Sequence, residues 1–264
     1  MKYALITGAG GGLGGACAQA FVAAGWAVFA TDLAAPDIDG TTPLAMDVTN
    51  QHSIDAAIAT IGKMTDTLDA VVNLAGVHTM GSLIEGDIAA TMEKLIDVNL
   101  MGMVRVNRAT IDLILNGHGR IINCSSECGY LKAQPFNGPY TISKYAVEAY
   151  TDSLHRELLG LDIKVIKIQP GSFKTGMHNS TLQGFEWLQS STSHHQKALQ
   201  KMQPLMTREL EHANDPAVLA QVVLKAAESP RPKSNYRVRN SGLLRLMQLV
   251  PNPLLDVVYR WMMR

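Results

Sequence analysis

The sequence predicts an α/β protein built on a doubly wound, parallel sheet of seven strands with helices on both faces. Short apolar runs alternate along the chain with longer segments of helical period, which is typical of βαβ units. A glycine-rich turn directly follows the first apolar run, where the first strand passes into the first helix. Because the 264 residues contain neither an internal repeat nor a low-complexity tract, we expect a single domain over 1–264.

The predicted strands are mostly continuous apolar runs, as expected of strands that are covered on both faces. They are Tyr3–Thr7, Ala27–Thr31, Pro43–Met46, Ala70–Leu74, Arg120–Cys124, Lys164–Gln169 and Tyr236–Arg239. Helical segments are predicted near 13–24, 51–62, 88–115, 138–160 and 215–228. A crossover helix returns the chain to the end of the sheet at which the previous strand began, so we expect parallel strands.

Two segments depart from this alternation. The stretch 172–214 runs for about 40 residues without a strand signal and mixes Met and aromatic residues with Ser, Gln and His, so we interpret it as a lid over the substrate. The tail, 241–264, is apolar with interspersed arginines and is divided by Pro251 and Pro253. Our preferred hypothesis is that the tail covers the substrate cleft or a subunit interface, and the alternative is docking on a membrane surface.

Composition argues against several classes of partner. Lys plus Arg total 23 and Asp plus Glu total 23, so no excess charge favours nucleic acid. Cys17, Cys124 and Cys128 form neither a disulfide framework nor a zinc pattern, which favours reduced thiols in a cytoplasmic protein without a metal site. The first strand starts at Tyr3 and no apolar run reaches about 18 residues, so we expect neither a signal peptide nor a transmembrane segment.

The glycine-rich turn predicts a phosphate-binding site. Glycines let the backbone approach a pyrophosphate, and the N-terminus of the following helix supplies N–H donors. The stretch 7–15 fits two patterns: T-G-x-x-x-G-x-G through Thr7, Gly8, Gly12 and Gly14 around Leu13, and G-x-G-x-x-G through Gly10, Gly12 and Gly15. We prefer the first pattern because its Thr-Gly pair directly ends the strand.

Asp32 follows the second strand, 18 residues after Gly14. An acidic residue about 20 residues beyond the turn accepts from the 2′-hydroxyl of the adenosine ribose and repels a 2′-phosphate. No Lys or Arg occurs between Tyr3 and Lys63 to form an ion pair with that phosphate. The sequence therefore predicts NAD rather than NADP, against the alternative that Asp32 only caps a turn.

Tyr140 and Lys144 are four residues apart in a predicted helix, so their side chains share one face. A nearby ammonium favours the phenolate, and we expect Lys144 to lower the pKa of Tyr140 toward the range useful for proton transfer. An exposed pair on a solvated helix is the alternative. His194 and His195 are adjacent and point in different directions on a helix, which argues against a metal site.

Taken together, these features resemble a single-domain, Rossmann-type short-chain dehydrogenase/reductase. Further stretches match the motifs of that family: Asp47-Val48, Asn73-Leu-Ala75-Gly76, Asn99 within Asp97–Leu100, Ser126 within Ile121–Ser126, and Pro170-Gly171-Ser-Phe173-Lys-Thr175. Leu74 replaces an asparagine of the family pattern, which puts one turn hydrogen bond in doubt. The segment Tyr140–Leu159 is similar to the branch of the family that oxidises steroids and retinol.

The resemblance implies a role for each catalytic residue. Tyr140 is the implied general acid/base, Ser126 polarises the substrate oxygen, Lys144 binds the nicotinamide ribose and Asn99 supports a water relay. Ser126 is chosen over Ser125 because it lies closer to the family spacing from Tyr140 and is the second serine of the pair. The implied cofactor contacts are Gly8, Gly12, Leu13, Gly14, Asp32, Asp47, Val48, Asn73, Ala75, Gly76, Tyr140, Lys144, Pro170, Gly171, Phe173 and Thr175, with Thr175 at the carboxamide.

The sequence thus predicts an NAD-dependent oxidoreductase that moves a hydride between nicotinamide and a secondary alcohol or ketone. The apolar lid favours a bulky hydrophobic substrate, such as a hydroxysteroid, a retinoid-like alcohol or an alicyclic alcohol. The resemblance also implies a homodimer or homotetramer formed through the helices near 88–115 and 138–160. Two alternatives remain: an NAD(H)-binding sensor or scaffold without turnover, and a different reaction on the same scaffold, such as sugar-nucleotide epimerisation.

Overall fold

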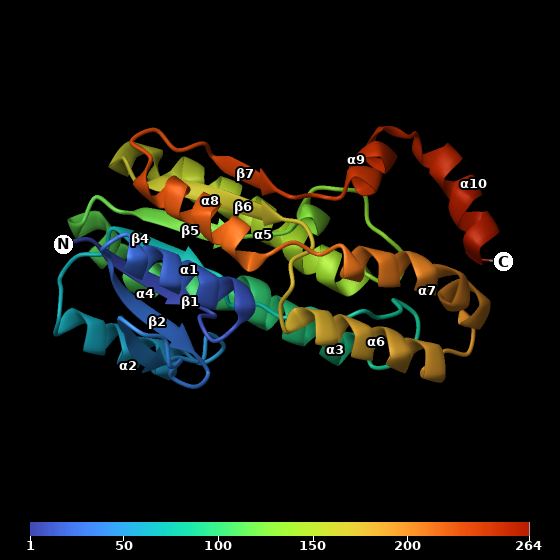
Figure 1. Cartoon of the computed structure of the whole chain (residues 1–264), viewed down its shortest axis with the longest axis horizontal. Helices are drawn as coiled ribbons and strands as arrows, with labels where there is room; N and C mark the ends of the chain where they lie inside the picture. Colours follow the sequence, from blue (N-terminus) through green and yellow to red (C-terminus); the bar gives the residue numbers. More distant parts are fainter. Residues whose placement is uncertain (264) are drawn as a thin grey trace.

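The sheet contains seven parallel strands in the order β3-β2-β1-β4-β5-β6-β7, which confirms the predicted fold class (Figure 1). The computed structural model describes residues 1–263, and side chains at all of these positions except 178, 209 and 210. The strands are β1 (Tyr3–Thr7), β2 (Ala27–Asp32), β3 (Thr41–Ala45), β4 (Ala70–Asn73), β5 (Arg120–Cys124), β6 (Lys164–Pro170) and β7 (Asn235–Val238). Each lies within two residues of its predicted position at either end.

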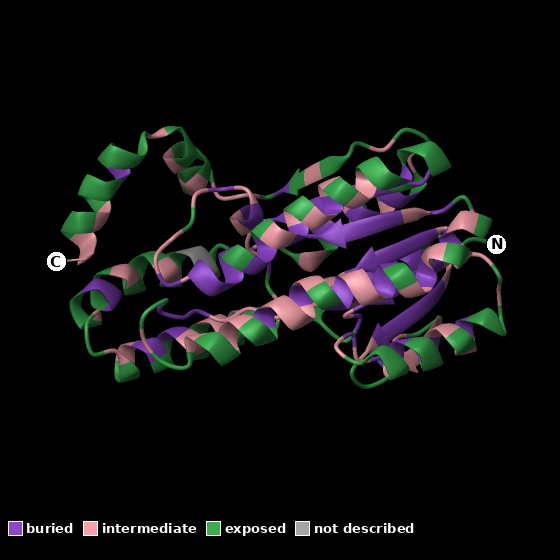
Figure 2. Cartoon of the chain, turned by 180° about the vertical axis from the view of Figure 1, so that it is seen from behind, coloured by how far each residue is buried: buried purple, intermediate pink, exposed green. Residues whose placement is uncertain are grey.

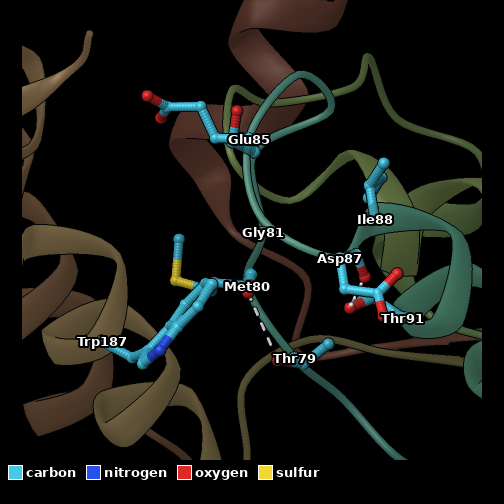
Figure 3. A pocket seen from close by; sticks show the side chains of 9 residues that line it. Thr79, Met80, Gly81, Glu85, Asp87, Ile88, Thr91 and Trp187 are labelled. Atoms are coloured by element: carbon cyan, nitrogen blue, oxygen red, sulfur yellow. Dashed lines mark hydrogen bonds between the residues drawn. The ribbon is translucent and has the colours of Figure 1, made fainter. Parts of the chain in front are cut away.

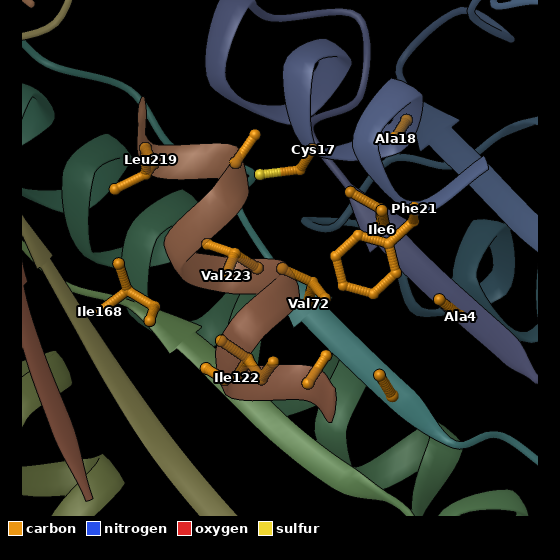
Figure 4. Close-up of a cluster of buried hydrophobic side chains, with 14 of the residues drawn as sticks. Ala4, Ile6, Cys17, Ala18, Phe21, Val72, Ile122, Ile168, Leu219 and Val223 are labelled. Atoms are coloured by element: carbon orange, nitrogen blue, oxygen red, sulfur yellow. The ribbon is translucent and has the colours of Figure 1, made fainter. Parts of the chain in front are cut away.

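Helices cover both faces of the sheet because the strand side chains alternate between two apolar clusters. Ala4 and Ile6 of β1 belong to one cluster, while Leu5 between them belongs to the other. The first cluster is covered by α1 (Gly12–Ala23) and α8 (Pro216–Glu228), and Figure 4 shows Phe21 and Val223 from these helices meeting over the strands. The second is covered by α2 (Gln51–Gly62), α4 (Met103–Asn116) and α5 (Gly138–Leu158).

The predicted helix 88–115 is interrupted, which corrects the expectation of one continuous helix. It consists of α3 (Ile88–Ile96), a π-helical segment η1 (Asp97–Gly102) and α4. Two tertiary contacts accompany the widened turn. The amide of Asn99 bonds the backbone of Val77, and Gly102 lies so close to Val48 that an added Cβ would be 2.7 Å from its Cγ2. π-Helical turns of this kind are frequent at functional sites.

The predicted lid region forms two helices, α6 (Met177–Ser191) and α7 (Gln196–Glu211), with a third apolar cluster beneath them. Phe185 and Leu188 of α6 and Leu199 of α7 are almost fully buried in this cluster. The Glu85 carboxylate also holds the connection between the helices, since it accepts from the Thr192 hydroxyl at 2.7 Å and from the backbone N–H groups of Ser193 and His194.

The predicted tail also forms two helices, α9 (Gly242–Leu249) and α10 (Asn252–Met263), separated at the two prolines. They lie at the opposite end of the long axis from the N-terminus, next to the lid (Figures 1 and 2). Arg264, the last residue of the predicted tail, lies outside the described residues. The short helical turns η2 (Glu127–Gly129) and η3 (Leu159–Leu161) complete the fold. None of the helices within residues 1–263 combines the length and hydropathy needed to cross a bilayer.

Candidate active site

The predicted site residues gather at the carboxyl ends of the strands, where open parallel sheets bind their ligands. Thr7, Asp32, Asn73 and Cys124 end or nearly end β1, β2, β4 and β5, and Pro170 ends β6. The chain order reverses between β1 and β4, which are neighbours in the sheet. The glycine turn after β1 and the Ala75–Gly76 turn after β4 therefore lie at the switch point.

The glycine turn fits the diphosphate of a dinucleotide. Gly8 has a φ of +70°, and Cβ atoms added at Gly8 and Gly14 would lie 2.7 Å from Ala75 N and 2.0 Å from Gly8 O. No side chain caps the N-terminus of α1 at Gly11, which leaves its first backbone donors open to a ligand. A cavity of about 560 Å³ borders this turn, lined by residues 9–12, 15, 16, 19, 36–38 and 215–217.

Asp32 lies against the glycine turn rather than in a separate loop. Its Oδ2 accepts from Gly10 N at 2.9 Å, and its Oδ1 accepts from Leu33 N at 2.8 Å. Asp47 follows the neighbouring strand β3, and its Oδ1 accepts from the backbone and hydroxyl of Thr49. The Val48 side chain is buried against Gly102. The structure therefore brings both predicted acidic residues to the same sheet edge as the turn.

The turn after β4 is fixed by side-chain hydrogen bonds. The Asn73 side chain is 2% exposed and donates to Asn107 and Asn123 at 2.7 and 2.9 Å, and a cofactor contact of Asn73 remains a prediction. Thr7 Oγ1 accepts from the backbone N–H groups of Leu74 and Ala75, which holds the turn despite the Leu74 replacement.

Tyr140 and Ser126 meet in the structure, whereas Ser125 points elsewhere. The Ser126 side chain is hydrogen-bonded to the Tyr140 side chain, and its Oγ also accepts from Cys128 N at 3.1 Å. Ser125 Oγ instead lies beneath Gly129, where an added Cβ would be 2.5 Å from it. Ser126 is thus the serine whose hydroxyl can share a substrate oxygen with the phenol.

Lys144 lies beneath the Tyr140 ring, with its Nζ 5.7 Å from the ring centroid. Nζ donates to the Cys124 carbonyl at 3.0 Å. Burial raises the pKa of Tyr140 far above its ordinary value, while the Ser126 hydrogen bond opposes part of the rise. Burial also lowers the pKa of Lys144. We expected a lowered pKa for Tyr140, whereas in this arrangement it is raised, because desolvation of the phenolate is the largest effect on it.

Asn99 is fully buried in η1, and its amide is fully used by its neighbours. Oδ1 accepts from Val77 N at 2.8 Å, and Nδ2 donates to Val77 O and Ser143 Oγ at 3.0 Å each. Oδ1 also lies opposite Gly76, where an added Cβ would be 3.2 Å from it and 3.8 Å from Lys144 Nζ. The amide thus fixes the turn beside Lys144, and the water relay remains a prediction.

The segment after β6 joins the sheet to the lid beside the glycine turn. Gly171 N donates to Val238 O at 2.9 Å, and a Cβ at Gly171 would be 2.2 Å from Arg239 O. Phe173 is buried and pairs with Asn214 in a short parallel bridge. Thr175 lies over the start of α1, since a Cβ at Gly12 would be 2.9 Å from Thr175 Cγ2. This places Thr175 next to the predicted cofactor turn.

His78 is the residue that the sequence analysis missed. Its ring packs edge-on against the Tyr140 ring, with centroids 4.5 Å apart. Nε2 bonds Asn137 Oδ1 at 3.0 Å, and Nδ1 bonds the Thr181 hydroxyl of α6 at 3.0 Å, so the histidine connects the lid to the tyrosine. Burial lowers the pKa of His78 to about 4. A lone histidine after a strand carries no sequence signal for such a role, because its contact with Thr181 joins residues 103 positions apart in the chain.

A second cavity, of about 240 Å³, lies between the loop 79–87 and the lid. Figure 3 shows Trp187 of α6 on one side of it and Asp87, Ile88 and Thr91 on the other. Neither Tyr140 nor His78 is among the residues that line this cavity. Within the described residues, no group of three or more His, Cys, Asp or Glu side chains is arranged to hold a metal ion.

Residues 2–184 match the family model described as short chain dehydrogenase. The chain therefore belongs to the short chain dehydrogenase family, whose members are oxidoreductases that bind a nicotinamide cofactor. This is the family that the sequence motifs resembled.

Among curated relatives, human 17-beta-hydroxysteroid dehydrogenase type 6 is 35% identical over 190 residues, which cover 68% of this chain and 59% of that protein. Mouse retinol dehydrogenase 16 is also 35% identical, again over 59% of its own length. Human retinol dehydrogenase 16 is 30% identical over 98% of this chain and 88% of its own. These relatives confirm the resemblance to the hydroxysteroid and retinol branch, although the chain spans only about three fifths of the first two.

Solved structures agree on the fold. The aldohexose dehydrogenase of Thermoplasma acidophilum, in ligand-free form, has a TM-score of 0.74 at 22% identity and covers 96% of this chain and 97% of its own. The 3-ketoacyl-(acyl-carrier-protein) reductase of Brucella melitensis, complexed with NADH, has a TM-score of 0.72 at 20% identity and covers 91% of this chain and 97% of its own.

Proposed function

We propose that this protein is an NAD-dependent dehydrogenase that interconverts a secondary alcohol and its ketone, with Tyr140 as the general acid/base. One observation carries the proposal: Ser126 is hydrogen-bonded to Tyr140, with Lys144 beneath the phenol ring. Two neighbouring hydroxyls can both hydrogen-bond one substrate oxygen, and this arrangement allows proton transfer to an alkoxide.

Each residue contributes a separate part of the chemistry. The Ser126 hydroxyl holds the substrate oxygen, and the Tyr140 phenol gives its proton to that oxygen during ketone reduction and takes it back during alcohol oxidation. The Lys144 ammonium offsets part of the charge when Tyr140 is a phenolate. His78 and the lid exclude water from the phenol. A bound nicotinamide would exchange the hydride with the carbinol carbon.

The residues around the glycine turn support NAD as the cofactor. Asp32 accepts from Gly10 N, and in this proposal its carboxylate would accept from the adenosine ribose of a dinucleotide held by the turn. A 2′-phosphate at that position would face this carboxylate, and no Lys or Arg occurs in residues 4–62 to compensate. Gly8, Gly12, Leu13 and Gly14 hold the diphosphate in this proposal, and Thr175 holds the carboxamide.

The substrate in this proposal is a bulky hydrophobic alcohol such as a hydroxysteroid, a retinoid-like alcohol or an alicyclic alcohol. Two features support it: the lid rests on an apolar cluster that includes Met80, Phe136 and Phe185, and the relatives are named for hydroxysteroid and retinol oxidation. We further propose a cytoplasmic protein that forms a homodimer or homotetramer. The partly exposed Met101 and Tyr145, on η1 and α5, are available for such an interface.

A binding protein without turnover is the second candidate. The burial of Tyr140 favours it, because the phenol is 8% exposed, lies beneath His78 and has a raised pKa. A sensor of NAD(H) would need the glycine turn and Asp32 but not the hydroxyl of Tyr140.

The Tyr140→Phe variant separates the two candidates. We expect it to lose about 10²–10⁴-fold of the rate with NAD⁺ and a panel of steroid, retinoid and alicyclic alcohols, followed by reduced-nicotinamide absorbance. NADH binding, followed by fluorescence titration, should stay within about threefold, because the ring remains. Tyr145→Phe is the matched control, since Tyr145 is on the same helix and its hydroxyl donates to Leu131 O.

A loss below about tenfold in Tyr140→Phe would contradict the acid/base role. No rate for the unmodified protein across the panel, together with tight NADH binding, would support the sensor.

A further inference from the structure

α10 has two apolar faces, and only one of them is used within the chain. Towards the protein, Leu255 is 5% exposed, Tyr259 donates to Gln134 Oε1 and Met263 packs on the lid cluster. The other face carries Leu254, Val257, Val258 and Trp261, at positions i, i+3, i+4 and i+7. Their exposed fractions are 59%, 60%, 55% and 73%, so most of this stripe faces solvent. The Trp261 ring has one polar neighbour, the Lys201 ammonium, 5.2 Å from its centroid.

α9 extends the same exposed surface. Leu243, Leu246 and Leu249 are 58%, 62% and 80% exposed and lie three residues apart on its outer side. Leu244 and Met247 between them are half-buried. We name the seven outward residues of α9 and α10 the outer tail face: Leu243, Leu246, Leu249, Leu254, Val257, Val258 and Trp261. Exposed apolar residues that recur along two consecutive helices differ from the scattered exposure that single surface leucines show.

The charge of the tail indicates what covers this face. Residues 241–264 contain three arginines, at 245, 260 and 264, and one acid, Asp256, in a chain whose formal net charge is zero. The described Arg245 and Arg260 are exposed beside the apolar stripe. Short helices with an apolar face, arginines and an exposed tryptophan are typical of segments that lie in the interface of a bilayer.

A second copy of the chain fits the outer tail face less well. A two-fold interface brings the same patch of each copy together, so the arginines of both tails would lie within one interface. Each copy brings only Asp256 to balance its three arginines. Anionic lipid headgroups offer the opposite charge at every arginine.

We propose that α9 and α10 dock the protein on the surface of an anionic phospholipid bilayer, with the outer tail face in the headgroup region. Docking on the bilayer does not depend on the proposed alcohol oxidation. It does place the lid, which contacts α10 through Lys201 and Trp261, next to the phase in which hydrophobic alcohols accumulate.

The test is sedimentation of the full chain with vesicles, without cofactor or substrate. Vesicles of phosphatidylcholine with about 30% phosphatidylglycerol are compared with pure phosphatidylcholine. We expect binding to the anionic vesicles that weakens with salt. The variant Leu254→Gln, Val258→Gln, Trp261→Gln should bind at least about tenfold more weakly, because it removes apolar surface that inserts. Circular dichroism of this variant should be unchanged, since all three side chains are exposed.

The control variant is Met64→Gln, Leu159→Gln, Leu161→Gln, which changes three equally exposed apolar residues outside the tail. It should bind like the unmodified protein. Equal loss in both variants, or no sedimentation with anionic vesicles, overturns the proposal. If the outer-face variant instead changes the mass in sedimentation equilibrium without lipid, the face is an interface between copies. Alcohol oxidation plays no part in these measurements, so they succeed or fail separately from the proposed activity.

Discussion

Tyr140 is held by three neighbours of different chemistry, and their arrangement determines its protonation. Ser126 bonds the hydroxyl, Lys144 lies below the ring and His78 packs on its edge. Because burial raises its pKa, the side chain is a phenol at neutral pH in this closed arrangement. That form suits proton donation to a ketone. Alcohol oxidation needs the phenolate, which burial of the phenol disfavours here.

His78 gives a pH prediction. Its pKa is about 4 in the fold against an ordinary value of 6.5, because burial disfavours the imidazolium and the Lys144 charge adds to the effect. The unfolded chain therefore binds the proton more readily, and the stability present above pH 6.5 is lost as the pH falls towards 4. We expect the free energy of unfolding to fall by roughly 3 kcal/mol from this group alone.

Urea unfolding at about pH 7 and pH 5 measures this loss. In His78→Gln, the free energy of unfolding should differ less between pH 7 and pH 5 than it does in the unmodified protein. The reduction should be about 2 kcal/mol. His52→Gln, at an exposed position of α2, is the control and should not change the difference. An unchanged difference in His78→Gln would show that another group carries the acid sensitivity.

At this scale the sequence predicted residue types better than their contacts. Motif spacing identified Ser126, Tyr140 and Lys144, and the structure brings these three side chains together. The spacing was informative because Tyr140 and Lys144 lie one helical turn apart and Ser126 follows a strand end. It gave no indication that the Asn73 side chain bonds Asn107 and Asn123, which come from a helix and a strand later in the chain. His78 was missed for the same reason: its partner Thr181 is 103 residues away. Long-range packing of this kind leaves no local pattern.

The elements around the site depend on close backbone approaches at glycine. β1, the turn and α1 meet so tightly that Gly14 has no space for a Cβ, since the added atom would be 2.0 Å from Gly8 O. Strand positions were predictable because buried parallel strands form continuous apolar runs. The π-helical turn η1 was not, because it follows from tertiary contacts of Asn99 and Gly102 and not from the helical period of 88–115.

The pair Gly14→Ala and Gly62→Ala tests this point. Gly14→Ala should lower the free energy of unfolding by about 1–3 kcal/mol or more, because the methyl group meets backbone that cannot move aside. Gly62 ends α2 with no atom within 4 Å of an added Cβ. Gly62→Ala should therefore raise the free energy of unfolding by about 0.5–1 kcal/mol. Chemical denaturation of both variants checks the prediction. A neutral Gly14→Ala would mean that the turn has more room than the structure shows.

The whole molecule consists of a sheet with two large apolar clusters and a lid with a smaller one. The sheet clusters are joined through β1, whose successive residues alternate between them. The lid cluster contains no strand residue and joins Met80 and Phe136 to α6, α7 and the end of α10. Polar contacts that connect the lid to the rest include those of Glu85 with Thr192 and of His78 with Thr181. A substrate can therefore reach Tyr140 if the lid opens while the sheet stays folded.

The Phe185→Ala variant tests whether the lid opens as a unit. Phe185 is 2% exposed in the lid cluster, and truncation of a buried phenylalanine typically costs about 3–5 kcal/mol. If the lid opens separately, this cost lowers the hydrogen-exchange protection of Met177–Ser191 and Gln196–Glu211, while the amides of β1, β4 and β5 keep theirs. Leu5→Ala, in a sheet cluster, should instead reduce protection throughout. Loss of protection in the strands of Phe185→Ala, in parallel with the lid, would show that lid and sheet unfold together, and a substrate would then need another way to reach Tyr140.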